Sequence, residues 1–171
     1  MSLQPVIDHT LTALRDAAAA VPDPEIPVLT LADLGILREV RRAPDGAPEI
    51  VLTPTYSGCP ATEAIRADVL AVASAIDPSA RVLLELAPAW TTDWITAEGR
   101  RKLTEYGIAP PAPTREQPVL VQLGRPPVSA PSCPRCGSSN TELISQFGST
   151  PCKALRRCRS CAEPFDEFKA L

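Results

Sequence analysis

Proline is concentrated in one stretch of this chain. Eight of its 20 prolines lie within the 25 residues from Pro110 to Pro134. Proline donates no backbone hydrogen bond and has a fixed φ, so it is excluded from helix interiors and central strands. The stretch predicts a stiff connector over residues 113–131, between a first domain over residues 1–112 and a second module over residues 132–171. A short strand over residues 119–123 is the regular element expected within it.

The overall composition excludes several classes of protein. With 44% hydrophobic and 22% charged residues among 171, the chain has enough apolar content to fold, which excludes wholesale disorder. The net charge of −3 argues against a protein whose whole surface binds nucleic acid. No apolar run approaches the roughly 20 residues that a membrane-spanning helix needs, and the first residues lack the features of a secretory signal. We therefore expect a cytoplasmic protein with no membrane partner.

Helical and strand patterns alternate along the first domain. They predict a helix over residues 11–21, a β-hairpin of strands over 36–41 and 49–53, a helix over 60–76, a strand over 81–86, and a last helix from 91 or 92 to 106. The uniformly apolar run over residues 81–86 is not expected to be an edge strand. The order α-β-β-α-β-α indicates an α+β fold, in which a small three-stranded sheet carries helices on one face.

Four cysteines near the end of the chain form two C-x-x-C pairs. Cys133 and Cys136 are separated by 21 residues from Cys158 and Cys161. In a reducing compartment, paired cysteines hold metal more often than they form disulfides, and four thiolates suit a tetrahedral ion. The module is also too short to build an adequate core without such a staple. We predict a zinc-ribbon-like β module with structural zinc, and an iron–sulfur cluster on the same four thiolates is the alternative.

The ribbon module contains further residues with two interpretations each. A hairpin of residues 143–147 and 153–157 is expected between the cysteine pairs. Cys152 is either a spare or functional thiol or an additional metal ligand. The phenylalanines predict a small core, whereas residues 164–168 could instead form an exposed docking patch. The phenylalanines of the module are Phe147, Phe165 and Phe168. A local basic cluster comprises Lys153, Arg156, Arg157 and Arg159. This cluster is either a solvated face or a contact surface for nucleic acid or an acidic protein.

The remaining cysteine, Cys59, lies between a predicted strand and a predicted helix. Gly58 precedes it and Pro60 follows it, which suits a helix start with Cys59 as the capping residue. The backbone N–H groups and dipole of a helix N-terminus stabilise a thiolate and lower its pKa. A single cysteine is, however, often only a small buried apolar residue. The sequence leaves open whether Cys59 is structural or a reactive, metal-passing thiol.

Two other motifs admit structural and functional interpretations. Asp23 and Glu25 lie on a proline-flanked turn, where turn formation and capping explain them about as well as a ligand role does. Trp90 and Trp94 lie at a helix start, where core packing is favoured over anchoring of a partner. The single histidine, His9, is expected on the surface of the first helix, so a histidine-based catalytic triad is implausible.

Several motifs together resemble a known family. The segments Asp23-Pro24-Glu25-Ile26-Pro27, Thr55-x-x-Gly58-Cys59-Pro60 and Trp90-Thr-x-Asp-Trp94 are similar to the SufT-type domain associated with iron–sulfur cluster assembly. With the terminal motifs Phe147-Gly148-Ser149-Thr150-x-Cys152-Lys153 and Glu163-Pro164-Phe165-Asp166-x-Phe168-Lys169, the whole chain resembles the PaaD family. Members of that family are small accessory subunits of bacterial phenylacetyl-CoA epoxidase systems.

The resemblance implies a role in phenylacetate degradation. There a di-iron oxygenase epoxidises the ring of a CoA thioester, and a reductase with a flavin and an iron–sulfur cluster supplies electrons. The family implies a non-catalytic protein that helps to mature the metal centres of the reductase or oxygenase. By position, Cys59 would handle iron or a transient iron–sulfur cluster, the four paired cysteines would bind metal, and Cys152 is the additional family cysteine.

The expected partners are therefore the reductase and oxygenase subunits, and a homodimer stays open. Two alternatives to an assembly factor remain. One is a zinc-dependent structural adaptor that docks partner subunits without cluster transfer. The other is a zinc-ribbon protein that binds nucleic acid, which the net charge disfavours.

Overall fold

The computed structural model describes residues 8–56, 61–111 and 130–170. The chain divides into two compact units, residues 1–90 and residues 91–171. Among the described residues, no helix is both long and apolar enough to cross a membrane. The predicted strand over residues 119–123 and nearly all of the predicted connector lie outside the described residues.

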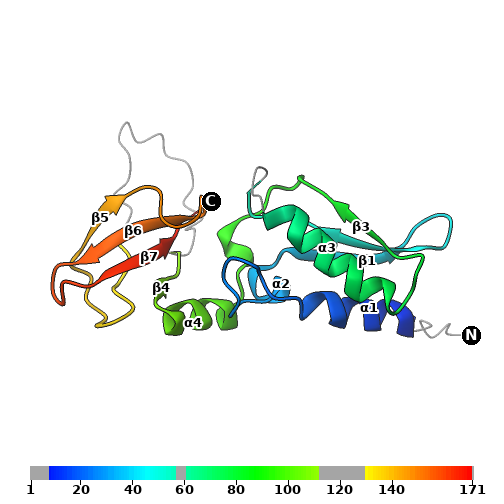
Figure 1. The fold of residues 1–171 in the computed structure, drawn as a ribbon, viewed down its shortest axis with the longest axis horizontal. Coiled ribbons are helices and arrows are strands. Elements are labelled where there is room, and N and C mark those ends of the chain that lie inside the picture. Colours follow the sequence, from blue (N-terminus) through cyan, green and yellow to red (C-terminus); the bar gives the residue numbers. More distant parts are fainter. Residues whose placement is uncertain (1–7, 57–60, 112–129, 171) are drawn as a thin grey trace, which may run out of the picture. The chain divides into compact units, whose positions relative to one another are not determined.

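A three-stranded sheet forms the centre of the first unit (Figure 1). Strands β1 (Leu37–Arg42) and β2 (Pro48–Leu52) form the predicted antiparallel hairpin, and β3 (Arg81–Leu84) pairs with β2 in parallel. The helices of this unit are α1 (His9–Ala19), α2 (Leu31–Leu34) and α3 (Ala61–Ser74). Helices α1 and α3 contact each other as well as the sheet, so they cover the same face. The predicted α+β architecture is confirmed.

The core of the first unit lies between this helical layer and the sheet. Leu14 of α1, Val69 of α3 and Ile50 of β2 are fully buried. Asp8 caps α1, because its Oδ1 accepts hydrogen bonds from the backbone N–H groups of Thr10 (3.0 Å) and Leu11 (3.2 Å). With this cap, α1 begins at His9, two residues before the predicted start. His9 is exposed, as expected.

The position of β3 differs from the prediction. The sheet order is β1-β2-β3, so β2 is central and β3 is an edge strand, with Leu84 38% exposed. The expectation that the apolar run over residues 81–86 is not an edge was therefore wrong. The strand contacts α3, and an apolar run alone carries no information about which strands lie beside it.

The second unit contains a four-stranded sheet with the order β4-β7-β6-β5. Strands β5 (Thr141–Ser145) and β6 (Lys153–Cys158) form the predicted ribbon hairpin, and β7 (Pro164–Phe168) pairs antiparallel with β6. The two-residue strand β4 (Ile108–Ala109) adds a parallel edge next to β7. Strands β4 and β7 were not predicted.

The predicted helix that ends at Tyr106 is interrupted. A short 3₁₀ turn, η1 (Thr92–Trp94), is followed by extended backbone at Ile95 and then by α4 (Ala97–Tyr106). Thr96 caps α4 by accepting a hydrogen bond from the Gly99 backbone N–H (3.0 Å). Helix α4 and strand β4 group with residues 130–170 in the second unit. The domain boundaries at residues 112 and 131 stay predictions from the sequence.

Candidate metal centre

The two C-x-x-C pairs lie at the same end of the ribbon hairpin. The first turn is closed by a hydrogen bond from the Gly137 backbone N–H to the Cys133 carbonyl (2.8 Å). In the second turn, the Cys158 backbone N–H donates to the Glu163 carbonyl (2.9 Å). The turns are joined by a hydrogen bond from the Arg159 backbone N–H to the Asn140 carbonyl (2.8 Å). Backbone pairing therefore brings the predicted ligands together from distant parts of the module.

The four sulfur atoms have the spacing of ligands to a single ion. All four Sγ atoms lie within 4.8 Å of one another, with Cys133 and Cys161 at 3.8 Å and Cys136 and Cys158 at 3.6 Å. Four zinc–sulfur bonds of about 2.3 Å in tetrahedral geometry separate the sulfur atoms by about 3.8 Å. A disulfide requires about 2.05 Å, and these cysteines are free thiols. An iron–sulfur cluster distributes its thiolates over different iron atoms, so the close group fits one ion better.

The electrostatics of the sulfur group also favour a bound cation. The Cys161 backbone N–H donates to the sulfur of Cys158 and lowers the pKa of that thiol to about 6. Although the Glu163 backbone N–H favours the thiolate of Cys161, desolvation and the neighbouring sulfur atoms raise the pKa of Cys161 to about 12. Cys161 therefore resists losing its proton beside the sulfur of Cys158. A divalent cation compensates the charge of four thiolates.

The sulfur group is part of the apolar core of the second unit. Cys133 and Cys158 are buried and pack in one cluster with Phe165 of β7 and Ala109 of β4. Phe168 is also buried, so two phenylalanines form the predicted small core, and the alternative of an exposed patch over residues 164–168 was wrong. Phe147 is 71% exposed, so its assignment to this core was wrong as well. It follows β5, which is an edge strand of the sheet that the described residues form.

Cys152 lies apart from the four-sulfur group. It is 8% exposed, and its sulfur lies 3.1 Å from the Thr150 hydroxyl oxygen. The group of close ligand atoms consists of Cys133, Cys136, Cys158 and Cys161 and does not include it. This placement favours the interpretation of Cys152 as a thiol outside the metal centre.

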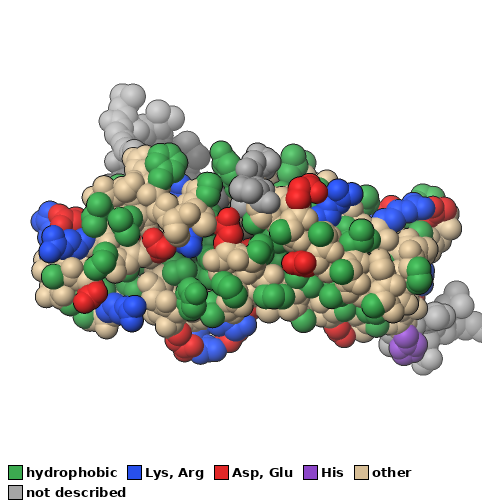
Figure 2. All heavy atoms as spheres, viewed as in Figure 1, with side chains coloured by type: hydrophobic (Ala, Val, Ile, Leu, Met, Phe, Trp, Pro, Cys, Tyr) green, Lys and Arg blue, Asp and Glu red, His purple; other side chains and the backbone are tan. Residues whose placement is uncertain are grey.

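The basic cluster near the metal centre is largely neutralised by carboxylates. Arg156 pairs with Glu167, and Arg159 pairs with Glu142 at 2.7 Å. Lys153 is buried and lies 3.8 Å from Asp166. On the face shown in Figure 2, basic and acidic side chains lie next to each other and form no broad basic area. The arrangement favours a structural role for these cations over nucleic-acid binding.

Cys59, with residues 57, 58 and 60, lies outside the described residues. The elements predicted on either side of it are present, since β2 ends at Leu52 and α3 begins at Ala61. Its proposed role stays a prediction.

The Asp23 carboxylate stabilises a turn. Its Oδ1 accepts hydrogen bonds from the backbone N–H groups of Glu25 (2.9 Å) and Ile26 (2.8 Å), and Asp23 itself is buried. Glu25 is half-buried. The group of possible metal ligands that the described residues bring together contains neither carboxylate. Turn formation therefore accounts for Asp23 without a ligand role.

In the tryptophan motif, Trp90 and Thr91 also have structural roles. Trp90 is 6% exposed, and its Nε1 donates a hydrogen bond to the Leu34 carbonyl (2.9 Å), as core packing predicts. The Thr91 hydroxyl accepts a hydrogen bond from the Asp93 backbone N–H (3.0 Å) and caps η1.

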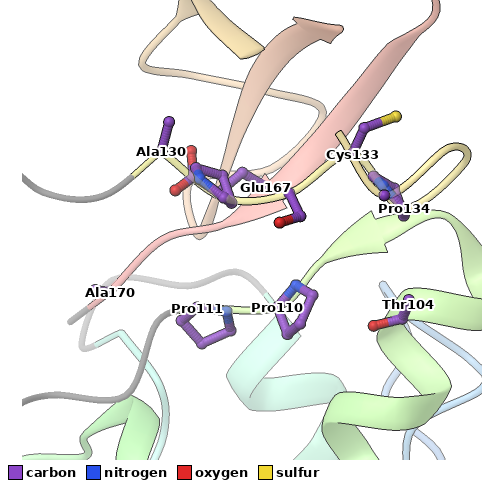
Figure 3. Close-up of a pocket in the computed structure, with 11 residues that line it drawn as sticks. Thr104, Pro110, Pro111, Ala130, Cys133, Pro134, Glu167 and Ala170 are labelled. Atoms are coloured by element: carbon purple, nitrogen blue, oxygen red, sulfur yellow. The ribbon is translucent and has the colours of Figure 1, made fainter. Parts of the chain in front are cut away.

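A cavity of about 470 Å³ lies beside the first cysteine pair within the second unit (Figure 3). Thr104 of α4 and two prolines after β4 line one side, and Cys133 and Pro134 lie opposite. Prolines and alanines make up about half of the lining, and its carboxylate, Glu167, is paired with Arg156. The lining therefore offers few free groups for acid–base chemistry.

One contact at the metal centre was not predicted from the sequence. The guanidinium of Arg135, within the first C-x-x-C pair, lies against Gly107 at the C-terminal end of α4: a Cβ on Gly107 would be 3.4 Å from Arg135 Nη2. A cation at this end of a helix is favourable, because the helix dipole is negative there. The C-x-x-C spacing indicates the ligands, but it carries no signal for this contact with a distant helix.

Comparisons with known proteins assign a family type to each part of the chain. Residues 11–84 match the model described as iron-sulfur cluster assembly protein, and residues 117–169 match the PaaD zinc beta ribbon domain. A curated protein of Escherichia coli (strain K12), described as a subunit of 1,2-phenylacetyl-CoA epoxidase, is 49% identical over 167 residues, which cover 95% of this chain and 93% of that protein.

Three solved structures are similar to part of the chain. A domain of unknown function from Bacillus anthracis is 26% identical, covers 55% of this chain and 91% of its own, and has a TM-score of 0.49. A conserved hypothetical protein from Thermotoga maritima is 25% identical, covers 60% and 98%, and has a TM-score of 0.43. A protein of Mycobacterium tuberculosis described as associated with Fe-S complex assembly and repair is 26% identical, covers 63% and 94%, and has a TM-score of 0.33.

Proposed function

Because the chain belongs to the PaaD family of 1,2-phenylacetyl-CoA epoxidase subunits, we propose that it is a non-catalytic accessory subunit that assists iron or iron–sulfur centre assembly in its epoxidase partners. Its client is the reductase or the oxygenase of the system, and it works in the cytoplasm. One observation carries the proposal: a domain of the iron–sulfur assembly type precedes a separate module with a closed four-cysteine centre.

The geometry of the four-cysteine centre separates two roles within the chain. Cys133, Cys136, Cys158 and Cys161 would hold a zinc ion, which supplies the stability that a short module lacks. With four protein ligands, such a site has no open position for an incoming substrate, whereas catalytic or exchanging sites keep one. The transferred metal must therefore be handled by another group.

Cys59 is the thiol available for that step within the matched assembly domain. Iron or a preformed cluster is the substrate, received by ligand exchange: an Fe–S bond to Cys59 forms as a bond to the donor breaks. Transfer to the client reverses this exchange. No change in oxidation state is required, and the proton of the thiol passes to solvent when the thiolate binds.

The experiment compares two single cysteine variants in cells that express the complete epoxidase system. Cys59→Ala should lower the iron content of the purified client and the epoxidase activity at least tenfold, because the substrate metal loses its ligand. Cys152→Ala is the matched control, since that thiol lies outside the four-sulfur group, and it should leave both quantities unchanged. Normal client iron content in the Cys59→Ala strain would contradict the proposal.

A second candidate function is a zinc-dependent structural adaptor that docks partner subunits without metal transfer. It is supported by the burial of Cys133 and Cys158 in the core, which makes the fold of this module depend on its ligands. Under this alternative, Cys136→Ala abolishes binding of the partner subunit, while Cys59→Ala has no effect on client iron content.

A further inference from the structure

We infer that an aromatic patch at the β5 edge of the ribbon sheet docks another protein subunit of the epoxidase system. The Phe147 patch comprises Leu143 and Ile144 of β5, Phe147 in the following turn, and Lys169 after β7. Its three apolar side chains are 46%, 52% and 71% exposed. The inference deepens the proposed function, on which it rests, by naming the surface that meets the client.

The strand that carries this patch is an irregular edge. Among the strands of the described residues, β5 is the outermost of this sheet, and its pairing with β6 shifts register between Leu143 and Ser145. Such an extra residue interrupts the alternation of side chains along a strand. Here two neighbouring apolar residues, Leu143 and Ile144, are both exposed. Exposed apolar side chains close together mark interaction surfaces more often than isolated ones do.

Phe147 is held in place by its neighbours although its ring is exposed. The Ser145 hydroxyl accepts a hydrogen bond from the Phe147 backbone N–H (3.1 Å) and donates one to the Phe147 carbonyl (2.8 Å). On the other side, Gly148 donates its N–H to the Lys153 carbonyl (2.8 Å). A Cβ on Gly148 would lie 3.1 Å from Asp166 Oδ1 and 3.3 Å from the Lys153 backbone, so the turn packs closely against the sheet.

An exposed aromatic on a fixed backbone loses little conformational freedom when it binds. Interfaces concentrate their binding energy in such aromatic residues, and fixing them beforehand reduces the entropy that binding removes. The structure thus presents Phe147 as an anchor for a pocket on another protein.

The charge of the patch identifies the partner's chemistry. Lys169 Nζ lies 5.0 Å from the centre of the Phe147 ring and donates to the Gln146 carbonyl (3.3 Å). Within the described ranges, no ion pair joins Lys169 to a carboxylate. The fitting partner has an apolar pocket for the ring and a carboxylate at its rim. A second copy of this chain would bring the same unpaired cation to the contact.

The test measures binding of the full-length, zinc-loaded chain to the purified reductase and oxygenase subunits of the same organism. Phe147→Ser should raise the Kd for one of them by at least about tenfold, because it removes the anchor. Lys169→Glu should weaken the same complex most at low ionic strength. Tyr106→Ser is the matched control: this aromatic is 54% exposed and precedes β4, at the opposite edge of the sheet, and binding should not change.

The inference is overturned if Phe147→Ser binds both subunits as tightly as the unmodified chain, or if the unmodified chain binds neither. It is also overturned if the substitution changes only self-association or binding to anionic phospholipid vesicles. Zinc content equal to that of the unmodified chain shows that the variant is folded. The proposed function has a separate readout, because it predicts an effect of Cys59→Ala on client iron content. If Cys59→Ala lowers the client iron content while Phe147→Ser leaves it normal, only the docking surface is wrong.

Discussion

Two of the four cysteines of the close sulfur group are buried residues and two are exposed. Cys133 and Cys158 belong to the core cluster of the second unit, while Cys136 and Cys161 are on its surface. The spacing of the cysteines was enough to predict this group, because two C-x-x-C pairs with a gap of this length are typical of a single four-thiolate metal site. The exposure of Phe147 could not be predicted in this way, since apolar character does not reveal which strands cover a residue.

Replacement of Cys136 tests the metal centre at the scale of one residue. Cys136→Ala removes one of four ligands without creating a cavity in the core, because the side chain is exposed. We expect the zinc affinity to fall more than about a hundredfold, since loss of even an outer-shell partner typically costs 10- to 100-fold. The measurement is zinc content by elemental analysis after dialysis against a competing chelator. Cys152→Ala should retain its zinc, and a Cys136→Ala protein with full zinc content would contradict the assignment.

The elements that the sequence predicted are those with strong local signals. The hairpin of β1 and β2 surrounds an Asp45-Gly46 turn, and α4 ends at Tyr106 with Gly107 as its C-cap, as predicted. Strand β4 has only two residues and exists because it pairs with β7, which follows more than 50 residues later. Such short strands have no periodic signal of their own. The same limit explains the wrong prediction for β3, whose neighbours are set by tertiary pairing.

The end of α4 provides a prediction at the scale of an element. Gly107 has φ 91° and lies against Arg135, whereas Gly46, with φ 85°, has open space within 4 Å of the position that a Cβ would take. Alanine in this left-handed region costs about 1 kcal/mol by backbone strain alone. We expect Gly107→Ala and Gly46→Ala to lower the free energy of unfolding by similar amounts, because a Cβ on Gly107 makes only an ordinary van der Waals contact with the guanidinium. Denaturant titration of both variants measures the difference.

A much larger loss of stability in Gly107→Ala than in Gly46→Ala would contradict this ordinary contact between Arg135 and the end of α4. A useful further comparison is Arg135→Ala combined with Gly107→Ala. The two effects should add to within about 0.5 kcal/mol, since the methyl group does not crowd the guanidinium.

At the scale of the molecule, the two units differ in what stabilises them. The first unit has an extensive apolar core built on β2, in which Ile50, Val51 and Leu52 are almost fully buried. In the second unit, a buried core cluster consists of Ala109, Cys133, Cys158 and Phe165, so two of its four members belong to the candidate metal site. The sequence indicated two modules, but it could not show that α4 and β4 group with the ribbon. That grouping depends on the pairing of β4 with β7.

Removal of the metal should therefore affect α4 as well as the ribbon. Without an ion, four close thiols lose the charge compensation that holds the two C-x-x-C turns together, and β7 loses part of the core that supports β4. We expect a chelator to accelerate amide hydrogen exchange in α4, residues 97–106, at least tenfold, while exchange in α1 and α3 of the first unit stays constant. Mass spectrometry of peptides from the full-length chain, with and without chelator, measures both. If α4 keeps its protection after the zinc is gone, its stability is independent of the four-cysteine centre and the second unit is not one metal-dependent body.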